Sequence, residues 1–294
     1  MTKITKVITT LLIFMLMAGC MDGKDEKKES PYARVQDYTG QEYRLPNGDK
    51  NDKIAEESRG AVISATEEFF IKKFNMKVKV NNIVGNKTGA SVYVQSVEGP
   101  LFHTFAVIPI DNQEKIRPEG IWTQEGEVEG AILSGIYALI HEEKIKHLDN
   151  YLDGFVKQYP VTGVREESYQ NTSSTGFTTP YYYITIPGDS LNPYFDHYVD
   201  NPMTTKEEYQ TKAQSLSADP KEFRIVIELY MKDKMEEPNQ KIFDELVADI
   251  EEMDNLPPGY YTIILNDNLI DKENGYGKKD NSLMRRNPEY IIKK

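Results

Sequence analysis

The chain has 294 residues, and its 47 acidic and 35 basic side chains give a formal net charge of −12 at pH 7. An acidic surface without a basic stripe repels phosphate backbones, so we expect no nucleic-acid partner. Apolar residues make up 39% of the chain, which is enough to form a folded core, and a single cysteine excludes an intrachain disulfide.

The N-terminus has the pattern of a secretory signal. Lys3 and Lys6 precede an uncharged, mostly apolar run over residues 7–17. This run is shorter than the roughly 20 apolar residues of a membrane-spanning helix, and it has the length of a signal's apolar core. Two small residues then lead to Cys20. We therefore expect residues 1–19 to be a signal peptide.

The segment Met17-Ala18-Gly19-Cys20 resembles the lipobox of bacterial lipoproteins, with Met in place of the usual Leu at its first position. In that class the cysteine receives a diacylglyceryl group and the chain is cut before it. The resemblance implies a protein held at the outer face of the cell membrane by lipid on Cys20, since two acyl chains suffice for stable anchoring. The alternative is a conventional signal or a small uncleaved anchor. The charged residues 20–30 predict a flexible tether.

Residues 31–160 predict an α+β region. One or two short strands are expected at its start, followed by an amphipathic helix over about 52–74. Alternating apolar residues and two turn clusters then predict an antiparallel meander over 78–110. Two helices follow and end at Tyr159-Pro160. The helix is expected to pack on the meander, because both have an apolar face to bury.

Residues 161–270 predict alternating strands and helices, so the fold class is α+β. The strongest signals are a capping box at Thr205, a strictly alternating strand over 223–231 and a helix followed by a last strand over 260–265. This region is either a second domain or continuous with residues 31–160. Residues 271–294 are expected to form a polar, loosely ordered tail.

The sequence contains no recognisable catalytic constellation. P-loops, nucleophile elbows, dinucleotide fingerprints and HExxH are absent, so no catalytic residue, cofactor or metal site is expected. The spacing of His141 and His147 does not suit zinc on a helix, and His141 is expected to be solvated. His103 lies in an apolar strand and is interpreted as structural. His197 lies in a tyrosine-rich segment.

That tyrosine-rich segment, residues 168–204, is rich in Tyr, Ser, Asn and Thr, a composition typical of recognition surfaces. One hypothesis is that four tyrosines form a surface that binds an extracytoplasmic protein or glycan: Tyr181, Tyr183, Tyr194 and Tyr198. Because adjacent strand residues face opposite ways, Tyr182 is expected to pack inward while its neighbours face outward. The alternative is that the tyrosines only pack the segment onto the body.

Over its full length the chain also resembles an uncharacterised family of lipoproteins from low-GC Gram-positive bacteria, of staphylococcal and bacillus type. Besides the lipobox, three stretches carry the resemblance: residues 121–129, 148–152 and 176–182. The resemblance implies a surface lipoprotein and supplies no activity.

The sequence thus indicates a membrane-anchored, extracytoplasmic lipoprotein, most simply a non-enzymatic binding or interaction module. One alternative is an extracytoplasmic hydrolase whose carboxylates come together only in the fold. Another is a solute-capture lipoprotein, which needs two lobes about a cleft. A pocket with two converging acids favours the enzyme, and an aromatic groove favours the binding module.

Overall fold

The computed structural model describes residues 30–214 and 218–294. The expected signal peptide, Cys20 and the tether up to residue 29 lie outside the described residues. Pro31–Lys294 forms one compact unit. Within the described part of the chain, no helix has the length and apolar character needed to cross a membrane.

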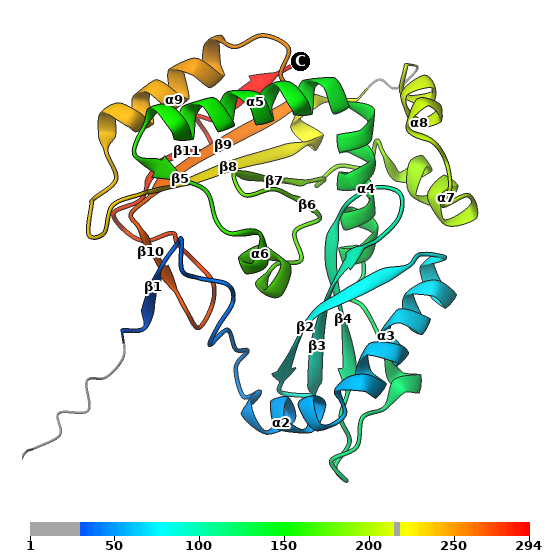
Figure 1. Ribbon diagram of the computed structural model, residues 1–294. Coiled ribbons are helices and arrows are strands. Elements are labelled where there is room, and N and C mark those ends of the chain that lie inside the picture. The colour runs from blue at the N-terminus through cyan, green and yellow to red at the C-terminus, as the bar shows by residue number, and fades with distance from the viewer. Residues whose placement is uncertain (1–29, 215–217) are drawn as a thin grey trace, which may run out of the picture. The chain divides into compact units, whose positions relative to one another are not determined.

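A mixed sheet of seven strands forms one end of this unit (Figure 1). Its main path runs in the order β11-β9-β8-β7-β6, with β5 paired to β8 and β12 paired to β9. The central strands β8 and β9 are parallel, and the other pairs are antiparallel. The strands are β5 (Val161–Thr162), β6 (Phe177–Thr178), β7 (Tyr182–Thr185), β8 (Arg224–Met231), β9 (Gly259–Asn266), β11 (Leu283–Arg285) and β12 (Ile291–Lys293).

Two helices cover one face of this sheet, α5 (Glu142–Gln158) and α9 (Gln240–Glu252). They lie side by side above the strands in Figure 1. The hydroxyl of Tyr151 on α5 donates a hydrogen bond to Asp249 on α9 over 2.8 Å. Both helices bury an apolar stripe in the same core as the sheet residues beneath them.

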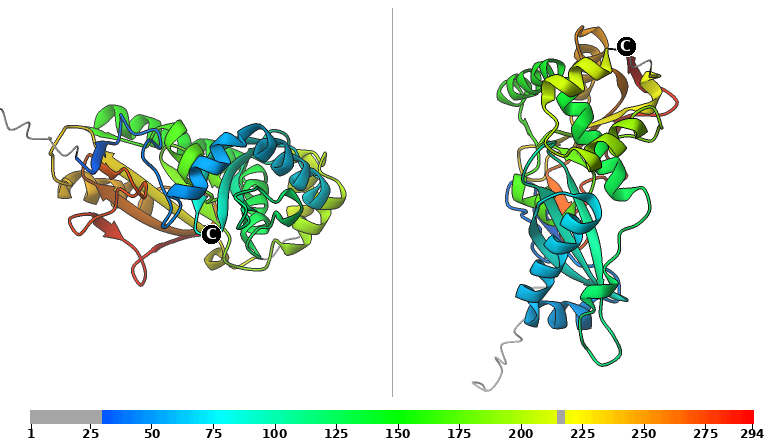
Figure 2. Two further views of the ribbon diagram at one scale, coloured as in Figure 1. Left: turned by 90° about the horizontal axis from the view of Figure 1, so that it is seen from below. Right: turned by 90° about the vertical axis from the view of Figure 1, so that its right-hand side faces the viewer.

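The predicted meander forms a separate antiparallel sheet of three strands, β2 (Val78–Asn86), β3 (Gly89–Ser96) and β4 (His103–Pro109). Figure 2 shows this sheet at the opposite end of the unit from the seven-stranded sheet. The helix predicted beside it is confirmed in place but is two helices, α2 (Asp49–Glu57) and α3 (Arg59–Phe74). The chain turns at Ser58, and α2 packs on β2 so closely that a Cβ on Gly85 would lie 2.2 Å from the Asp52 amide nitrogen.

The helix α4 (Glu127–Ile140) connects the two ends and is buried along most of its length. The predicted pair of α4 and α5 is confirmed. One hydrophobic cluster runs from Ala55 to Ile291 and includes residues on both sides of Pro160. Three short helices pack around it: α6 (Glu166–Thr172), α7 (Asn192–Asp200) and α8 (Lys206–Ala213).

The prediction of a loosely ordered tail over residues 271–294 is wrong. Strands β11 and β12 both pair with β9, and β10 (Leu269–Asp271) pairs with β1 (Tyr32–Arg34). These strands have only three residues each, so their alternation is too short to read in the sequence. The α+β class itself is confirmed, with the capping box of Thr205 and Glu208 at the start of α8.

Candidate ligand pocket

The seven-stranded sheet has a second face that α5 and α9 do not cover. Strand alternation places Ile227 and Leu229 in the core and Glu228 and Tyr230 on this second face. Tyr183 pairs with Val226 in the register of β7 and β8, so it shares the face with Glu228. The side chains of Tyr183, Glu228 and Tyr230 therefore point to the same side of the sheet, because successive strand residues alternate between its two faces.

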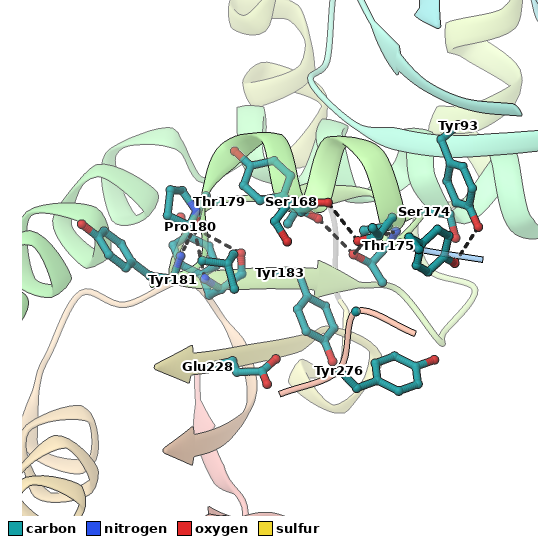
Figure 3. Close-up of a pocket in the computed structure, with 18 of the residues that line it drawn as sticks. Tyr93, Ser168, Ser174, Thr175, Thr179, Pro180, Tyr181, Tyr183, Glu228 and Tyr276 are labelled. Atoms are coloured by element: carbon teal, nitrogen blue, oxygen red, sulfur yellow. Dashed lines mark hydrogen bonds between the residues drawn. The ribbon is translucent and has the colours of Figure 1, made fainter. Parts of the chain in front are cut away.

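A pocket of about 350 Å³ lies over this face. Figure 3 shows Tyr183, Glu228 and Tyr276 together on one side of it and Tyr93 on the other. Its wall is made of phenol rings, hydroxyl groups and one carboxyl group. The side chains that carry this chemistry are Tyr43, Tyr93, Ser168, Tyr169, Thr172, Ser173, Ser174, Thr175, Thr178, Thr179, Tyr181, Tyr182, Tyr183, Glu228, Tyr230 and Tyr276.

The pocket brings together parts of the chain that are distant in sequence. Tyr93 comes from β3 of the three-stranded sheet, whereas Tyr183 and Glu228 come from the seven-stranded sheet. The C-terminal loop lies directly on the sheet face, because a Cβ on Gly277 would be 2.1 Å from the Tyr230 ring. Tyr276, on the same loop, also lines the pocket and has 71% of its surface exposed.

On the far wall, Tyr43 and Tyr93 form a pair. Their hydroxyl oxygens are 2.8 Å apart, and their rings meet edge to face with centroids 5.8 Å apart. Burial, followed by the neighbouring Tyr43, raises the pKa of Tyr93 far above its ordinary value. Burial likewise raises the pKa of Tyr169 to about 12. These phenols therefore stay protonated at physiological pH and present hydrogen-bonding hydroxyls and flat ring faces.

Glu228 is the only carboxylate among the residues that line this pocket. Its Oε1 accepts hydrogen bonds from the Tyr230 hydroxyl at 3.0 Å and from the Asn266 amide at 2.7 Å. Burial raises the pKa of Glu228, although these two hydrogen bonds and the charge of Lys278 favour its ionised form. A carboxyl group held in this way offers hydrogen-bonding oxygens in a tyrosine-lined pocket, which is typical of functional sites.

The structure keeps two of the four predicted tyrosines together, because Tyr181 and Tyr183 both line the pocket. Tyr182 packs inward as predicted, with 2% of its surface exposed, and its hydroxyl donates to Asp149 on α5 over 2.8 Å. The hydroxyl of Tyr181 donates to Asp153 on α5 over 3.0 Å, because Tyr181 precedes β7 and does not follow its alternation. Of the predicted residues, Tyr183 is the one whose position on the strand places it at Glu228.

The prediction that Tyr194 and Tyr198 belong to the same surface is wrong. Both lie on α7 and are buried, with 8% and 2% of their surface exposed. Their spacing of four residues puts them on one helical face, and α7 packs against α4. Pro193 in the first turn and this spacing were the signals for a helix in a segment that was expected to be mostly irregular.

The histidines lie outside the pocket wall. His103 is buried, its ring meets Tyr169 edge to face at 5.2 Å, and the structural interpretation is confirmed. His141 is not solvated as expected: it lies half-buried against Tyr137, and burial lowers its pKa to about 4. The Nε2 of His197 is 3.0 Å from the Thr204 hydroxyl.

Acidic residues gather in a different hollow of about 550 Å³, at the start of α4. Its acids are Glu125, Glu129, Asp189 and Asp196. In the described ranges, no three His, Cys, Asp or Glu side chains are arranged to hold a metal ion. The structure therefore contains one candidate site for each alternative. The acidic hollow is the candidate for a hydrolase, and the tyrosine-lined pocket is the candidate for a binding module.

Comparisons with known proteins define the family. The model of DUF1672, a family of proteins of unknown function, matches residues 25–293, and the chain belongs to this family. The crystal structure of a DUF1672 family protein from Staphylococcus aureus subsp. aureus Mu50 is similar, with a TM-score of 0.72 and 20% sequence identity. The match covers 90% of this chain and 99% of that chain. At this identity the likeness shows the fold alone. No curated protein matches the chain.

The family membership confirms the resemblance to an uncharacterised family, and the lipobox stays a prediction.

Most residues of the pocket were not predicted from the sequence. Glu228 carried a readable signal, because it is an acid between the apolar residues Ile227 and Leu229 in the middle of an alternating strand. Tyr43, Tyr93 and Tyr276 carried none, since they meet only through the tertiary fold.

Proposed function

We propose that this protein is a membrane-anchored, extracytoplasmic binding module that takes its ligand in the tyrosine-lined pocket. The observation that carries this proposal is the convergence of Tyr93, Tyr183, Tyr276 and Glu228 on one hollow. Tyrosines supply broad, rigid contact area at a small cost in side-chain entropy, and the surrounding hydroxyls orient a polar ligand.

The proposed location at the membrane rests on the sequence. The lipobox-like segment ending at Cys20 precedes the family match, which begins at residue 25, so an anchor there leaves the matched region intact. A lipid on Cys20 would hold the body at the outer face of the cell membrane, with residues 21–30 as a tether. The ligand in this proposal is therefore a component of the space outside the membrane.

The chemistry of the pocket favours binding over hydrolysis. Glycoside and similar hydrolyses use two carboxyl groups that face each other across the substrate. The wall of the tyrosine pocket supplies one, Glu228. The acidic hollow near α4 supplies several acids but only one aromatic ring, that of Phe195. The solute-capture alternative also agrees with the structure, because residues of both sheets line the pocket.

The proposal is tested by measuring ligand binding with a variant that alters the pocket alone. The full chain, purified in detergent, is applied to a carbohydrate array and to a peptide array. Tyr183→Ala removes a half-buried ring from the pocket wall. Binding to at least one array is expected for the wild type and is expected to be lost in the variant, because the ring supplies contact area at the centre of the site.

Tyr290→Ala is the matched control. Tyr290 is a half-buried tyrosine whose ring contacts Tyr260 with an interplanar angle of 52°, and it lines neither the tyrosine-lined pocket nor the acidic hollow. The control is expected to bind like the wild type. Binding that survives Tyr183→Ala unchanged, or no binding to either array, contradicts the proposed function.

A further inference from the structure

A second hollow of about 510 Å³ adjoins the tyrosine-lined pocket at Tyr276. The two hollows share a common wall, which is made of Tyr183, Glu228, Tyr230, Gly275 and Tyr276. Beyond it, the second hollow adds Ile264 and the loop residues 277–280. The site therefore has two lobes with the Glu228 carboxyl group between them.

The lining of the site matches a ligand that has flat apolar faces and many hydroxyl groups. Tyrosine rings offer the faces in both lobes. Serine, threonine and tyrosine hydroxyls offer paired donors and acceptors in the first lobe, and tyrosine hydroxyls and charged side chains do so in the second. Few aliphatic side chains take part: Val164 and the ring of Pro180 in the first lobe and Ile264 in the second. A bound peptide anchored by apolar side chains would need deeper aliphatic or aromatic pockets than these.

The charged residues that line the two lobes narrow the class of ligand further. The first lobe contains no cation that would attract an anion. In the second lobe, Lys279 is held by Asp267 Oδ1 and by the Leu269 carbonyl, each at 2.6 Å. Lys278 is exposed at the rim and faces Glu228. Asp280 also lines the second lobe, so the walls of the two lobes carry two carboxyl groups and two lysines. These charges do not form a site for an anionic group, so a neutral ligand fits best.

We propose that the site takes a linear, neutral oligosaccharide of at least two rings, with successive rings on either side of Tyr276. This inference rests on the proposed function and names its ligand class. The ring in the first lobe lies among Tyr93, Tyr169 and Tyr183, and the next ring passes Tyr276 into the second lobe. The Glu228 carboxyl group hydrogen-bonds hydroxyls near the linkage.

The test is the dependence of affinity on ligand length, measured by calorimetry with the full chain in detergent. The probes are two neutral series of one to five rings, β-1,4-linked N-acetylglucosamine oligomers and cello-oligosaccharides. In at least one series, affinity is expected to rise by about tenfold or more between one ring and three rings, because a second lobe becomes occupied. Oligogalacturonates of the same lengths serve as the anionic comparison and are expected to bind more weakly.

Tyr276→Ala links the length effect to the boundary between the lobes. Because 71% of the Tyr276 surface is exposed, the substitution should leave folding unchanged. The variant is expected to lose the gain between one and three rings, whereas Tyr290→Ala keeps it. An affinity that does not depend on length in either neutral series, or a length effect that survives Tyr276→Ala, overturns the inference.

Failure of this inference differs from failure of the proposed function. If neither neutral series binds, but the peptide array or the anionic oligomers bind in a way that Tyr183→Ala abolishes, the ligand class is wrong and the pocket still binds. If Tyr183→Ala changes no binding at all, the proposed function fails as well.

Discussion

The hydroxyl of Tyr182 on β7 donates a hydrogen bond to Asp149 Oδ1 on α5 over 2.8 Å. This contact joins the seven-stranded sheet to the helix that covers it. The next residue, Tyr183, has its side chain on the opposite face of the sheet, beside Glu228. One step along the strand thus turns one tyrosine ring into the core and the next onto the face that carries Glu228.

Tyr182→Ala is expected to lower the free energy of unfolding by on the order of 3 kcal/mol, because it removes a fully packed aromatic ring. Tyr182→Phe keeps the ring and loses only the bond to Asp149, so a cost of about 1 kcal/mol is expected. Chemical denaturation of both variants measures the difference. Equal costs for Ala and Phe would contradict the assignment of Tyr182 to the core.

His141 makes the fold sensitive to acid. Burial, and then the charge of Lys144, lower its pKa from 6.5 to about 4 in the folded chain. The folded state therefore binds fewer protons than the unfolded state between these values, and stability is lost as the pH falls from 6.5 towards 4. The loss attributable to His141 is up to about 3 kcal/mol.

His141→Phe keeps an aromatic ring against Tyr137 and removes the titrating group. The variant is expected to lose less stability than the wild type between pH 7 and pH 4 in urea unfolding curves. His147→Gln, at an exposed position on α5, is the control and should follow the wild type. An identical pH dependence for His141→Phe and the wild type would refute this role.

Glu228 has the opposite effect on the pH dependence of stability. Burial raises its pKa in the folded state, so the folded state binds more protons and stability falls as the pH rises above about 4.5. Glu228→Gln keeps an oxygen that accepts from Tyr230 and Asn266 without the buried charge. The variant is expected to be more stable than the wild type at pH 7, with a difference that shrinks towards pH 4.

Thermal unfolding across this pH range measures the effect, and Glu57→Gln at the exposed end of α2 is the control. A Glu228→Gln variant that is less stable than the wild type at pH 7 would show that the carboxylate is stabilised in the fold. The pocket would then carry a fixed negative charge rather than a carboxyl group that is readily protonated.

Cys20→Ala tests the proposed anchor. As the only cysteine in the chain, Cys20 is the one thiol that a lipobox enzyme can modify. Cells that express the wild type are expected to incorporate a fatty-acid analogue into the protein, and cells that express the variant are not. Label in the variant equal to that in the wild type would show that the anchor assignment is wrong.

The sequence predicted the elements whose apolar pattern is long and local. Strand β8 alternates over eight residues, and the meander of β2, β3 and β4 is closed by turns that Gly and Asn mark clearly. Helix α9 has a continuous apolar stripe. Such patterns follow from contacts within one element or between neighbours, so they are readable without the tertiary fold.

The parts that were missed depend on distant partners. Strands β11 and β12 are stabilised by pairing with β9 and have little pattern of their own. The tyrosines of α7 pack inward because α4 lies against that helix, which composition alone does not reveal. The pocket wall is assembled from Tyr43, Tyr93, Glu228 and Tyr276, and their sequence separations gave no sign of proximity.

The most direct test of the central claim, that the tyrosine-lined pocket is the binding site, is hydrogen–deuterium exchange of the full chain with and without the oligosaccharide that binds most tightly. Slower exchange is expected in residues 172–183 and 274–276, at the tyrosine-lined pocket, and in residues 277–280, at the second lobe. No change is expected in α7, where Tyr194 and Tyr198 are buried. Protection of α7 alone, or protection only around the acidic hollow at the start of α4, would contradict the claim.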